Sequence, residues 1–350
     1  MHFVKLDGLR GLSILMVIAG HWLMLSKFYI ANIGVEIFFV LSGFLITLIL
    51  LKNKSETNGT DVSSVLKKFY IRRFLRIFPI YYLVLFICYT YSYPNATIRQ
   101  HFTWDILYLN NVYAWLYNLK LKNFVHLWSL SVEEQFYLIW PWVILLTPHK
   151  FLKKILIGTI FTGIAFRFFY YSPITTLGID FPMGTTLLPA CFDLFAAGGL
   201  LAYYFKYHPQ NVTNHAQYSI YFFLAGLLIM IISKLSNNNL FFQTSFRIGS
   251  SISAVSLILI CLKSSPSIMD VIFNNPALIY IGRISYGLYL FHLLYVDEPF
   301  VQVYSQIAGH EPRFMWILIS RFCLLIIIGS VSWYFFERPI NNLKDKLAAY

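Results

Sequence analysis

Apolar residues along this chain gather in ten long runs separated by shorter polar segments. The runs cover residues 8–26, 31–51, 74–93, 131–147, 151–171, 187–207, 216–234, 246–263, 276–296 and 314–336. A helix needs about 20 apolar residues to cross the hydrocarbon core of a bilayer, so each run is close to one span in length. The pattern predicts an all-α polytopic membrane protein, a bundle of about ten transmembrane helices.

The composition agrees with a membrane protein and excludes several other classes. Of the residues, 58% are hydrophobic and 12% are charged, whereas a soluble domain carries about 25% charged residues. This excludes a disordered chain, a collagen-like chain and a disulfide scaffold. The first run has no small-residue cleavage site after it, so we expect a retained span rather than a signal peptide. The four cysteines have no metal-ligand spacing, and no metal site is predicted.

The distribution of the basic residues predicts the orientation in the membrane. The net charge is +12, from 27 Lys and Arg against 15 Asp and Glu. These cations lie in short loops between apolar runs, so topology explains them better than a nucleic-acid partner. About two thirds of them fall on the side that holds both termini and the segment 52–76. The positive-inside rule therefore predicts that both termini are cytoplasmic.

Three ionisable residues inside the first two runs are candidates for catalysis. Arg10 and His21 are 11 residues apart, which places them on one face of a helix about 16 Å apart. Glu36 in the second run lies at about the depth of His21. A carboxylate beside an imidazole holds one tautomer, so we predict a general base, His21, oriented by Glu36. The alternatives are an interfacial arginine, a histidine bonded to a backbone carbonyl and a carboxylate bonded elsewhere.

Arginines at the start of the third run form a candidate anion site. Arg72, Arg73 and Arg76 are spaced three and four residues apart, so Arg76 shares a helix face with the other two. Guanidinium groups bind phosphate in a bidentate manner, and the preceding loop uses lysine instead. We predict a phosphate site at the cytoplasmic surface. The alternative is a basic helix end that only sets the topology.

Four further residues are candidates for binding the acceptor substrate. Glu133 and Glu134 would fall in the first turn of the fourth helix, where the helix dipole favours them, or bind a polar acceptor at an outer rim. Trp128 would be an interface anchor or a surface for stacking a sugar. His292, towards the outer end of its run, would be a second catalytic histidine or a packed one.

Six segments in order along the chain resemble the acyltransferase-3 family of membrane-bound O-acyltransferases. They are LDGLRGLSILMVIAGHW, GVEIFFVLSGFLIT, FYIRRFLRIFPIYY, HLWSLSVEEQFYLIWP, GRISYGLYLFH and FERPI. The family's R-x10-H falls on Arg10 and His21, and its R-x-x-R falls on Arg73 and Arg76. The family usually has an acid at the position of Glu36. The resemblance implies one transmembrane acyltransferase domain over residues 1–350, without the extracellular SGNH esterase-like domain of some members.

One segment departs from the family pattern. Many members have an arginine directly before a Phe-Asp pair, where this chain has Cys191 before Phe192 and Asp193. The departure leaves the role of Asp193 open.

The resemblance implies an enzyme of the bacterial cytoplasmic membrane that takes acetyl groups from cytoplasmic acetyl-CoA. The acceptor would be a hydroxyl of a surface or lipid-linked glycan, such as lipopolysaccharide, capsule or peptidoglycan. Arg73 and Arg76 would hold the CoA phosphates, and the pantetheine arm would pass Arg10 and bring the thioester to His21. No serine or cysteine has a convincing nucleophile arrangement, which favours direct transfer; an acetyl-His21 intermediate stays open. Partners would be acetyl-CoA, the glycan and membrane lipids.

Two other classes of function are compatible with charges inside spans. A transporter or flippase would also place charges around a cavity at mid-membrane, but it usually has paired halves with broken helices, which are not visible in this sequence. A non-catalytic partner of a polysaccharide assembly complex would tolerate the loss of His21. Acetyl-CoA turnover by the purified protein separates these classes from an acyltransferase.

Overall fold

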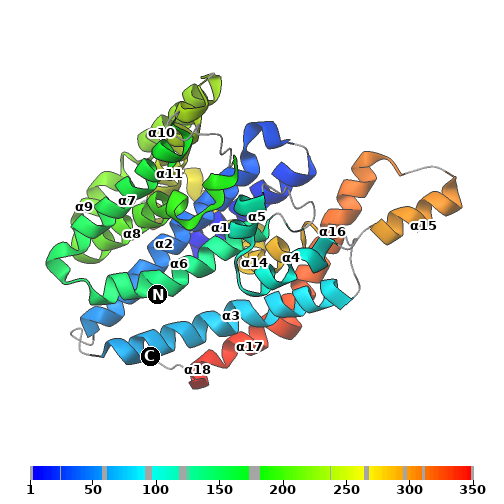
Figure 1. Cartoon of the computed structure of the whole chain (residues 1–350), viewed down its shortest axis with the longest axis horizontal. Coiled ribbons are helices and arrows are strands. Elements are labelled where there is room, and N and C mark those ends of the chain that lie inside the picture. The colour runs from blue at the N-terminus through cyan, green and yellow to red at the C-terminus, as the bar shows by residue number, and fades with distance from the viewer. Residues whose placement is uncertain are drawn as a thin grey trace.

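The computed structural model describes residues 3–23, 25–56, 61–90, 97–117, 124, 126–172, 182–236, 238–263, 268–294, 298–309 and 312–347. Every regular element in these ranges is a helix, and they contain no strand (Figure 1). The predicted all-α class is confirmed.

The longer helices are α1 (Val4–Trp22), α2 (Ile30–Glu56), α3 (Val62–Thr90), α6 (Leu127–Leu146), α7 (His149–Tyr171), α8 (Phe192–Tyr207), α10 (Ser219–Leu235), α11 (Asn239–Leu262) and α16 (Phe314–Ser332). The shorter ones are α4 (Thr97–Ile106), α5 (Asn110–Tyr117), α9 (Pro209–Ala216), α12 (Ile268–Phe273), α13 (Pro276–Arg283), α14 (Ser285–Phe291), α15 (Glu298–Ala308), α17 (Arg338–Asn342) and α18 (Lys344–Leu347). Single turns η1 (Leu25–Phe28), η3 (Pro182–Thr186), η4 (Leu188–Cys191) and η5 (Trp333–Glu337) complete the order.

Each predicted apolar run falls on a helix or on two consecutive helices, although several boundaries differ. The helix α3 begins twelve residues before the predicted run, and the run 276–296 is divided into α13 and α14 at Ile284. Among the described residues, four helical segments are long and apolar enough to cross a membrane: Ile30–Glu56, Leu188–Tyr207, Asn239–Leu262 and Phe314–Asn342. The number of spans stays a prediction.

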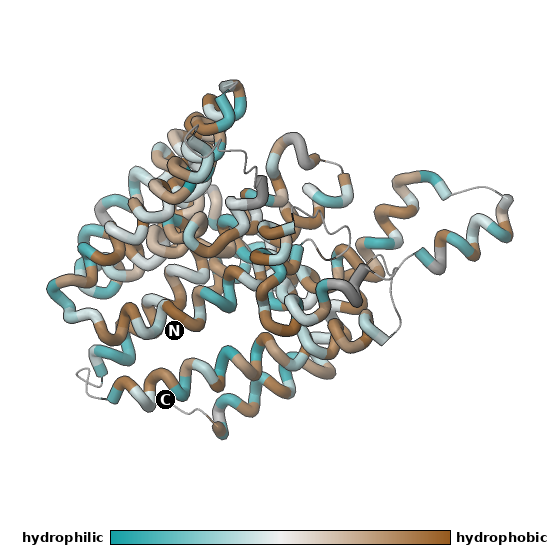
Figure 2. The backbone as a smooth tube through the Cα atoms, viewed as in Figure 1, coloured by the Kyte–Doolittle hydropathy of each residue, from teal (hydrophilic) through white to brown (hydrophobic). Residues whose placement is uncertain are grey.

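Helix α16 presents an apolar surface to the outside of the bundle. Phe314, Trp316 and Ile327 are more than half exposed, and apolar residues line the outer helices in Figure 2. A helix that is apolar and unburied matches a lipid environment, because in water such a patch would drive association. This is the surface expected of a membrane protein.

Glycines bring the central helices into backbone contact. A Cβ at Gly43 of α2 would lie 2.0 Å from the Phe195 carbonyl oxygen of α8. Between α1 and α13, a Cβ at Gly11 would lie 2.1 Å from the Leu278 oxygen, and one at Gly282 would lie 1.8 Å from the Asp7 oxygen. Small residues permit this spacing, which is typical of helix pairs in membranes. The seam of α1 with α13 contains backbone rather than side chains at these points.

The orientation is open to a direct test with reporter fusions. We expect fusions after Asn58 and after Tyr350, which lie outside the described residues, to report a cytoplasmic location, because the basic segment 52–76 is retained on that side. A fusion after Tyr117, at the end of α5, should report an external location. An external signal at residue 58 would overturn the topology.

Candidate active site

Helix α1 carries Arg10 and His21 on one continuous helix, as predicted. Their separation of 11 residues corresponds to about 16 Å along the axis. The Arg10 Nη1 atom lies 2.7 Å from Oδ1 of Asp7, one turn earlier, and Asp7 is buried. His21 lies in the last turn of the helix. The helix therefore places a paired guanidinium near one end and an imidazole at the other.

His21 contacts a second histidine from a distant part of the chain. Its Nδ1 atom lies 3.1 Å from Nε2 of His292, which directly follows α14. Nδ1 of His292 lies 2.7 Å from the Tyr289 carbonyl oxygen, and the Trp22 indole donates to the His292 carbonyl oxygen at 2.9 Å. Only 1% of the His292 surface is exposed. Both ring nitrogens of His292 are engaged within the protein, which agrees with the packed alternative, and its contact with substrate stays a prediction.

The structure does not bring Glu36 and His21 together as predicted. The Glu36 Oε1 atom accepts a hydrogen bond from Nε of Arg247 at 2.9 Å, and both side chains are buried. Arg247 lies inside α11, although the sequence places it beside a polar segment. Glu36 is therefore the partner of a buried arginine.

The packing of α1 against α2 explains why this carboxylate does not reach the histidine. Gly20 of α1 lies against Ala31 of α2, whereas Gly34 lies against Val17. Glu36 is further along α2, so it lies level with the middle of α1. The first apolar run predicts a span to residue 26, but α1 ends at Trp22. His21 is therefore at the C-terminal end of α1, beyond the level at which Glu36 lies.

A cavity of about 280 Å³ lies among α1, α2, α3, α6 and α14. Its charged lining residues are Asp7, Arg10, Arg73, Arg76, Glu133 and Glu134. Along α2 the lining extends from Ile49 to Val35, about 21 Å at 1.5 Å per residue. Ser129 and Tyr289 also line it, and the Tyr289 carbonyl is the one that binds His292. One lining residue therefore also binds the histidine pair, although neither His21 nor His292 lines the cavity.

Two of the three predicted phosphate-binding arginines line this cavity. The guanidinium groups of Arg73 and Arg76 make no hydrogen bond or ion pair to any described residue. Arg73 lies over the rings of Phe69 and Tyr137, at 5.6 and 5.1 Å from their centroids. Arg72 does not line the cavity, and its part in phosphate binding stays a prediction. The free donors of Arg73 and Arg76 suit an anionic ligand.

The two glutamates predicted at a separate outer rim share the cavity with these arginines. Helix α6 begins at Leu127, four residues before the predicted run, so Glu133 falls in its second turn. Oε1 of Glu133 accepts hydrogen bonds from the hydroxyl groups of Tyr137 and Ser42. The first-turn placement is therefore wrong, and the binding of an acceptor at an outer rim stays a prediction. The cavity has three arginines and three carboxylates, so its formal charge is balanced rather than strongly positive.

Trp128 packs within the protein beside the cavity. Its ring meets Phe39 edge to face, with centroids 6.0 Å apart, and Phe39 lines the cavity. The tryptophan is half-buried. It supports the cavity wall, and its predicted stacking with a sugar stays a prediction.

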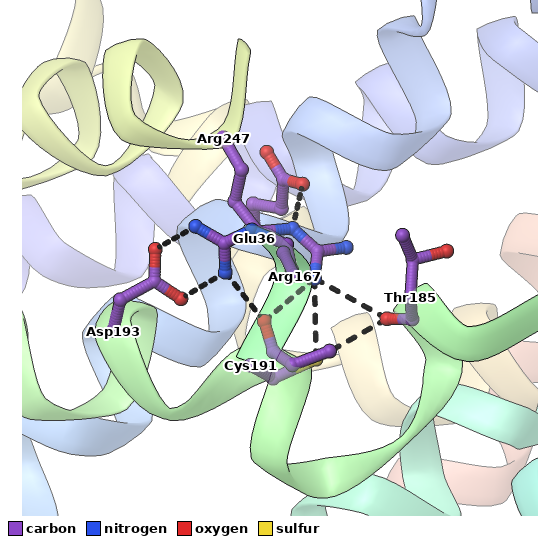
Figure 3. A network of polar contacts seen from close by, with 7 residues as sticks. Glu36, Arg167, Thr185, Cys191, Asp193 and Arg247 are labelled. Carbon is purple, nitrogen blue, oxygen red and sulfur yellow. Dashed lines mark hydrogen bonds and ion pairs between the residues drawn. The ribbon is translucent and has the colours of Figure 1, made fainter. Parts of the chain in front are cut away.

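Two buried ion pairs, which the sequence did not predict, form one network (Figure 3). Arg167 of α7 binds Asp193 of α8 through two hydrogen bonds of 2.7 Å, and Arg167 is fully buried. The Ala190 carbonyl oxygen accepts from Arg167 at 2.6 Å and from Arg247 at 3.0 Å, which joins this pair to Glu36. Asp193, whose role was open, is the counter-ion of Arg167. The only signal in the sequence was the presence of arginines within apolar runs.

The comparison with known families decides the classification. The family profile described as an acyltransferase domain, acyltransferase-3, matches residues 3–340. The chain belongs to the acyltransferase-3 family. The expected family is confirmed, and no solved structure matches the chain.

Relatives of this acyltransferase include named proteins of three bacteria. A "Peptidoglycan O-acetyltransferase OatA" of Listeria monocytogenes is 31% identical over 97% of this chain and 56% of its own length. A "Putative O-acetyltransferase" of Staphylococcus aureus is 30% identical over 96% of this chain and 57% of its own length. A "Putative peptidoglycan O-acetyltransferase YrhL" of Bacillus subtilis is 25% identical over 96% and 54%. The chain spans a little over half the length of these relatives.

The structure shows what surrounds Cys191, where this acyltransferase departs from the family pattern. Where the resemblance places an arginine before Phe-Asp, this chain has Cys191, and its Sγ atom lies 3.6 Å from Nη1 of Arg247. The same nitrogen donates to the Thr185 carbonyl oxygen at 3.2 Å. A guanidinium group from α11 therefore lies beside the position of the missing arginine.

Proposed function

We propose that this acyltransferase moves an acetyl group from acetyl-CoA to a glycan hydroxyl on the outer side of the bacterial cytoplasmic membrane. One observation carries the proposal. The cavity that contains Arg10, Arg73 and Arg76 extends along α2 and is lined by Tyr289, whose carbonyl binds His292 in the pair His21 and His292. The arginines would hold the donor in this cavity, and its thioester would have to reach the imidazole of His21 beyond Tyr289.

The lining of the cavity suits the donor. Acetyl-CoA has phosphate groups at one end and a thioester at the other, joined by a long arm with two amides. The unpaired guanidinium groups of Arg73 and Arg76 would bind the phosphates, because their forks match phosphate oxygens. Apolar side chains of α2 such as Phe38 and Leu45 would contact the arm, and the Glu134 carboxylate would accept from an amide N–H. Arg10, already paired with Asp7, would lie beside its path.

His21 would act as the general base. Its imidazole would take the proton of the acceptor hydroxyl while the hydroxyl oxygen attacks the thioester carbonyl. The new C–O bond forms, the C–S bond breaks, and the CoA thiolate leaves with the proton that the imidazolium returns. Electrons and protons balance without a metal or a covalent enzyme intermediate. Glu36, bonded to Arg247, has no part in this step.

The relatives favour peptidoglycan as the acceptor class. Two of the three relatives described above carry peptidoglycan in their names. This chain matches only part of each relative, so their names do not establish its acceptor. The acceptor is therefore tested directly. Purified protein in detergent is incubated with acetyl-CoA labelled in the acetyl group and with muropeptides. Muropeptides that gain one ester-linked acetyl group support the proposal, and free acetate or unchanged muropeptides with active enzyme would exclude this acceptor.

Loss of either cavity arginine should weaken donor use. We expect Arg73→Ala and Arg76→Ala each to raise KM for acetyl-CoA about 10- to 150-fold, because a charge-assisted hydrogen bond contributes about 1.5–3 kcal/mol. Lysine should restore only part of the loss, because it lacks the guanidinium fork. The measurement is initial rate against acetyl-CoA concentration.

The matched control for this prediction is the neighbouring Arg72. It carries the same charge on the same helix but does not line the cavity, so Arg72→Ala should keep KM within about twofold, as surface substitutions usually do. Equal effects of all three variants would show that the arginines act only through topology.

A further inference from the structure

We propose that His292 is a positioning residue that fixes the tautomer of His21 and thereby selects the atom that takes the proton. The inference rests on the proposed function, because it assumes that His21 is the base. It replaces the predicted carboxylate partner with a neutral histidine.

The first contact determines which nitrogen of His292 carries hydrogen. Nδ1 of His292 lies 2.7 Å from the carbonyl oxygen of Tyr289. A carbonyl oxygen can only accept, so Nδ1 must be the donor. In a neutral imidazole one nitrogen carries hydrogen and the other has a lone pair. Nε2 of His292 is therefore an acceptor.

The second contact transmits this choice to His21. Nε2 of His292 lies 3.1 Å from Nδ1 of His21. Because Nε2 accepts, Nδ1 of His21 must donate. The lone pair of His21 is then on Nε2. The Val17 carbonyl oxygen, one turn earlier on α1, also accepts from the His21 ring and favours the same hydrogen on Nδ1, the nitrogen nearer the backbone. The Val17 carbonyl and His292 together thus leave Nε2 of His21 as the base.

The third contact and the surroundings hold this arrangement in place. The indole of Trp22, next to His21, donates to the backbone oxygen of His292 at 2.9 Å. The rings of Tyr289 and His126 lie 5.4 and 4.9 Å from that of His292, and Arg321 lies over the Trp22 ring at 5.6 Å. Among the described residues, no carboxylate makes a hydrogen bond or ion pair with His21 or His292.

A neutral partner has a different chemical consequence from a carboxylate. A carboxylate would stabilise the imidazolium form of the base by its charge, as in an Asp-His pair. His292 directs the lone pair but contributes no negative charge. The proton that His21 takes from the hydroxyl is therefore held weakly and passes readily to the departing thiolate. This suits a base that must return its proton within the same turnover.

The test compares two replacements of His292 in the purified full-length protein. Asparagine can still reach the Tyr289 carbonyl but has no atom at the position of Nε2, whereas the glutamine amide oxygen can accept from Nδ1 of His21. We expect His292→Asn to lower kcat about 100-fold or more, within the range of general base catalysis, with KM for acetyl-CoA nearly unchanged. His292→Gln should recover at least about tenfold of that loss.

Two controls separate this role from the general effect of losing an imidazole and from the proposed function. His149, exposed at the start of α7, packs against Tyr203 and Tyr207 rather than against this cluster, so His149→Asn should keep kcat within about threefold, as surface substitutions usually do. His21→Ala is measured beside them. An active His21→Ala protein would overturn the proposed function, whereas an inactive His21→Ala with an active His292→Asn would overturn only the role of His292.

A spectroscopic measurement on the wild-type protein needs no variant to fold. Nitrogen NMR of protein labelled with ¹⁵N-histidine, at neutral pH, distinguishes ring nitrogens with and without hydrogen. We expect the His21 signal, identified by its loss in His21→Gln, to show hydrogen on Nδ1 and none on Nε2. Hydrogen on Nε2, or an even mixture of tautomers, would overturn the proposal.

Discussion

Replacing His21 by alanine should abolish acetyl transfer while the protein still binds acetyl-CoA. General base catalysis contributes about 10²- to 10⁴-fold, so the single-turnover rate should fall at least that far. Donor binding should persist because His21 is not among the residues that line the cavity with Arg73 and Arg76. The measurements are rapid-quench acetyl transfer and equilibrium binding of acetyl-CoA by the same purified protein.

The matched control for this experiment is His215, which is exposed on α9 and far in sequence from the site. His215→Ala should transfer at the wild-type rate. A wild-type rate for His21→Ala would remove the mechanism and leave His292 as the next candidate.

The same role predicts the direction of the pH dependence. Only neutral imidazole accepts a proton, so kcat should fall as the pH drops through the pKa of His21 and level off above it. Glu36→Gln should leave the shape of this profile unchanged, because Glu36 is bonded to Arg247 rather than to His21. A shift of the pH profile in Glu36→Gln would mean that Glu36 does act on His21.

Breaking the buried pair of Arg167 and Asp193 should have the largest effect on stability. In Asp193→Ala the guanidinium of Arg167, which is fully buried, loses a partner that accepts two hydrogen bonds of 2.7 Å. Leaving a buried charge uncompensated costs about 3–5 kcal/mol. We expect a correspondingly lower free energy of unfolding, measured by denaturant titration in detergent micelles.

Two control variants show whether the loss of stability comes from an isolated buried charge. Removing both charges in Arg167→Met with Asp193→Leu should cost much less than Asp193→Ala, because no isolated charge remains. The exposed pair of Lys52 and Glu56, 3.7 Å apart, provides the surface control. Glu56→Ala should cost no more than about 1 kcal/mol. Asp193→Ala with wild-type stability would mean that Arg167 finds other partners.

The sequence predicted those features that depend on local periodicity. The ten apolar runs correspond to helices, and Arg10 and His21 lie on one helix because a spacing of eleven residues nearly completes three turns. Arg73 and Arg76 share a cavity for the same reason.

Partners across the fold could not be predicted in this way. His21 and His292 are 271 residues apart, and Glu36 and Arg247 are 211 apart. Which of several charged groups meet depends on the exact ends and depths of helices, and an error of four residues in α1 moved His21 away from its true level. Because a helix rises about 1.5 Å per residue, an error of four residues moves a side chain about 6 Å along the axis, out of reach of a hydrogen-bond partner.

The backbone seam between α1 and α13 determines which parts of this acyltransferase can open. Where a Cβ at Gly11 or Gly282 would meet a carbonyl oxygen, no side chain is available to change rotamer and allow sliding. These contacts restrict sliding of α1 along α13, so a displacement of α13 would carry His21, at the end of α1, with it. Helix α16 lies in a segment of which only 11% is buried, so fewer contacts of this kind hold it in place.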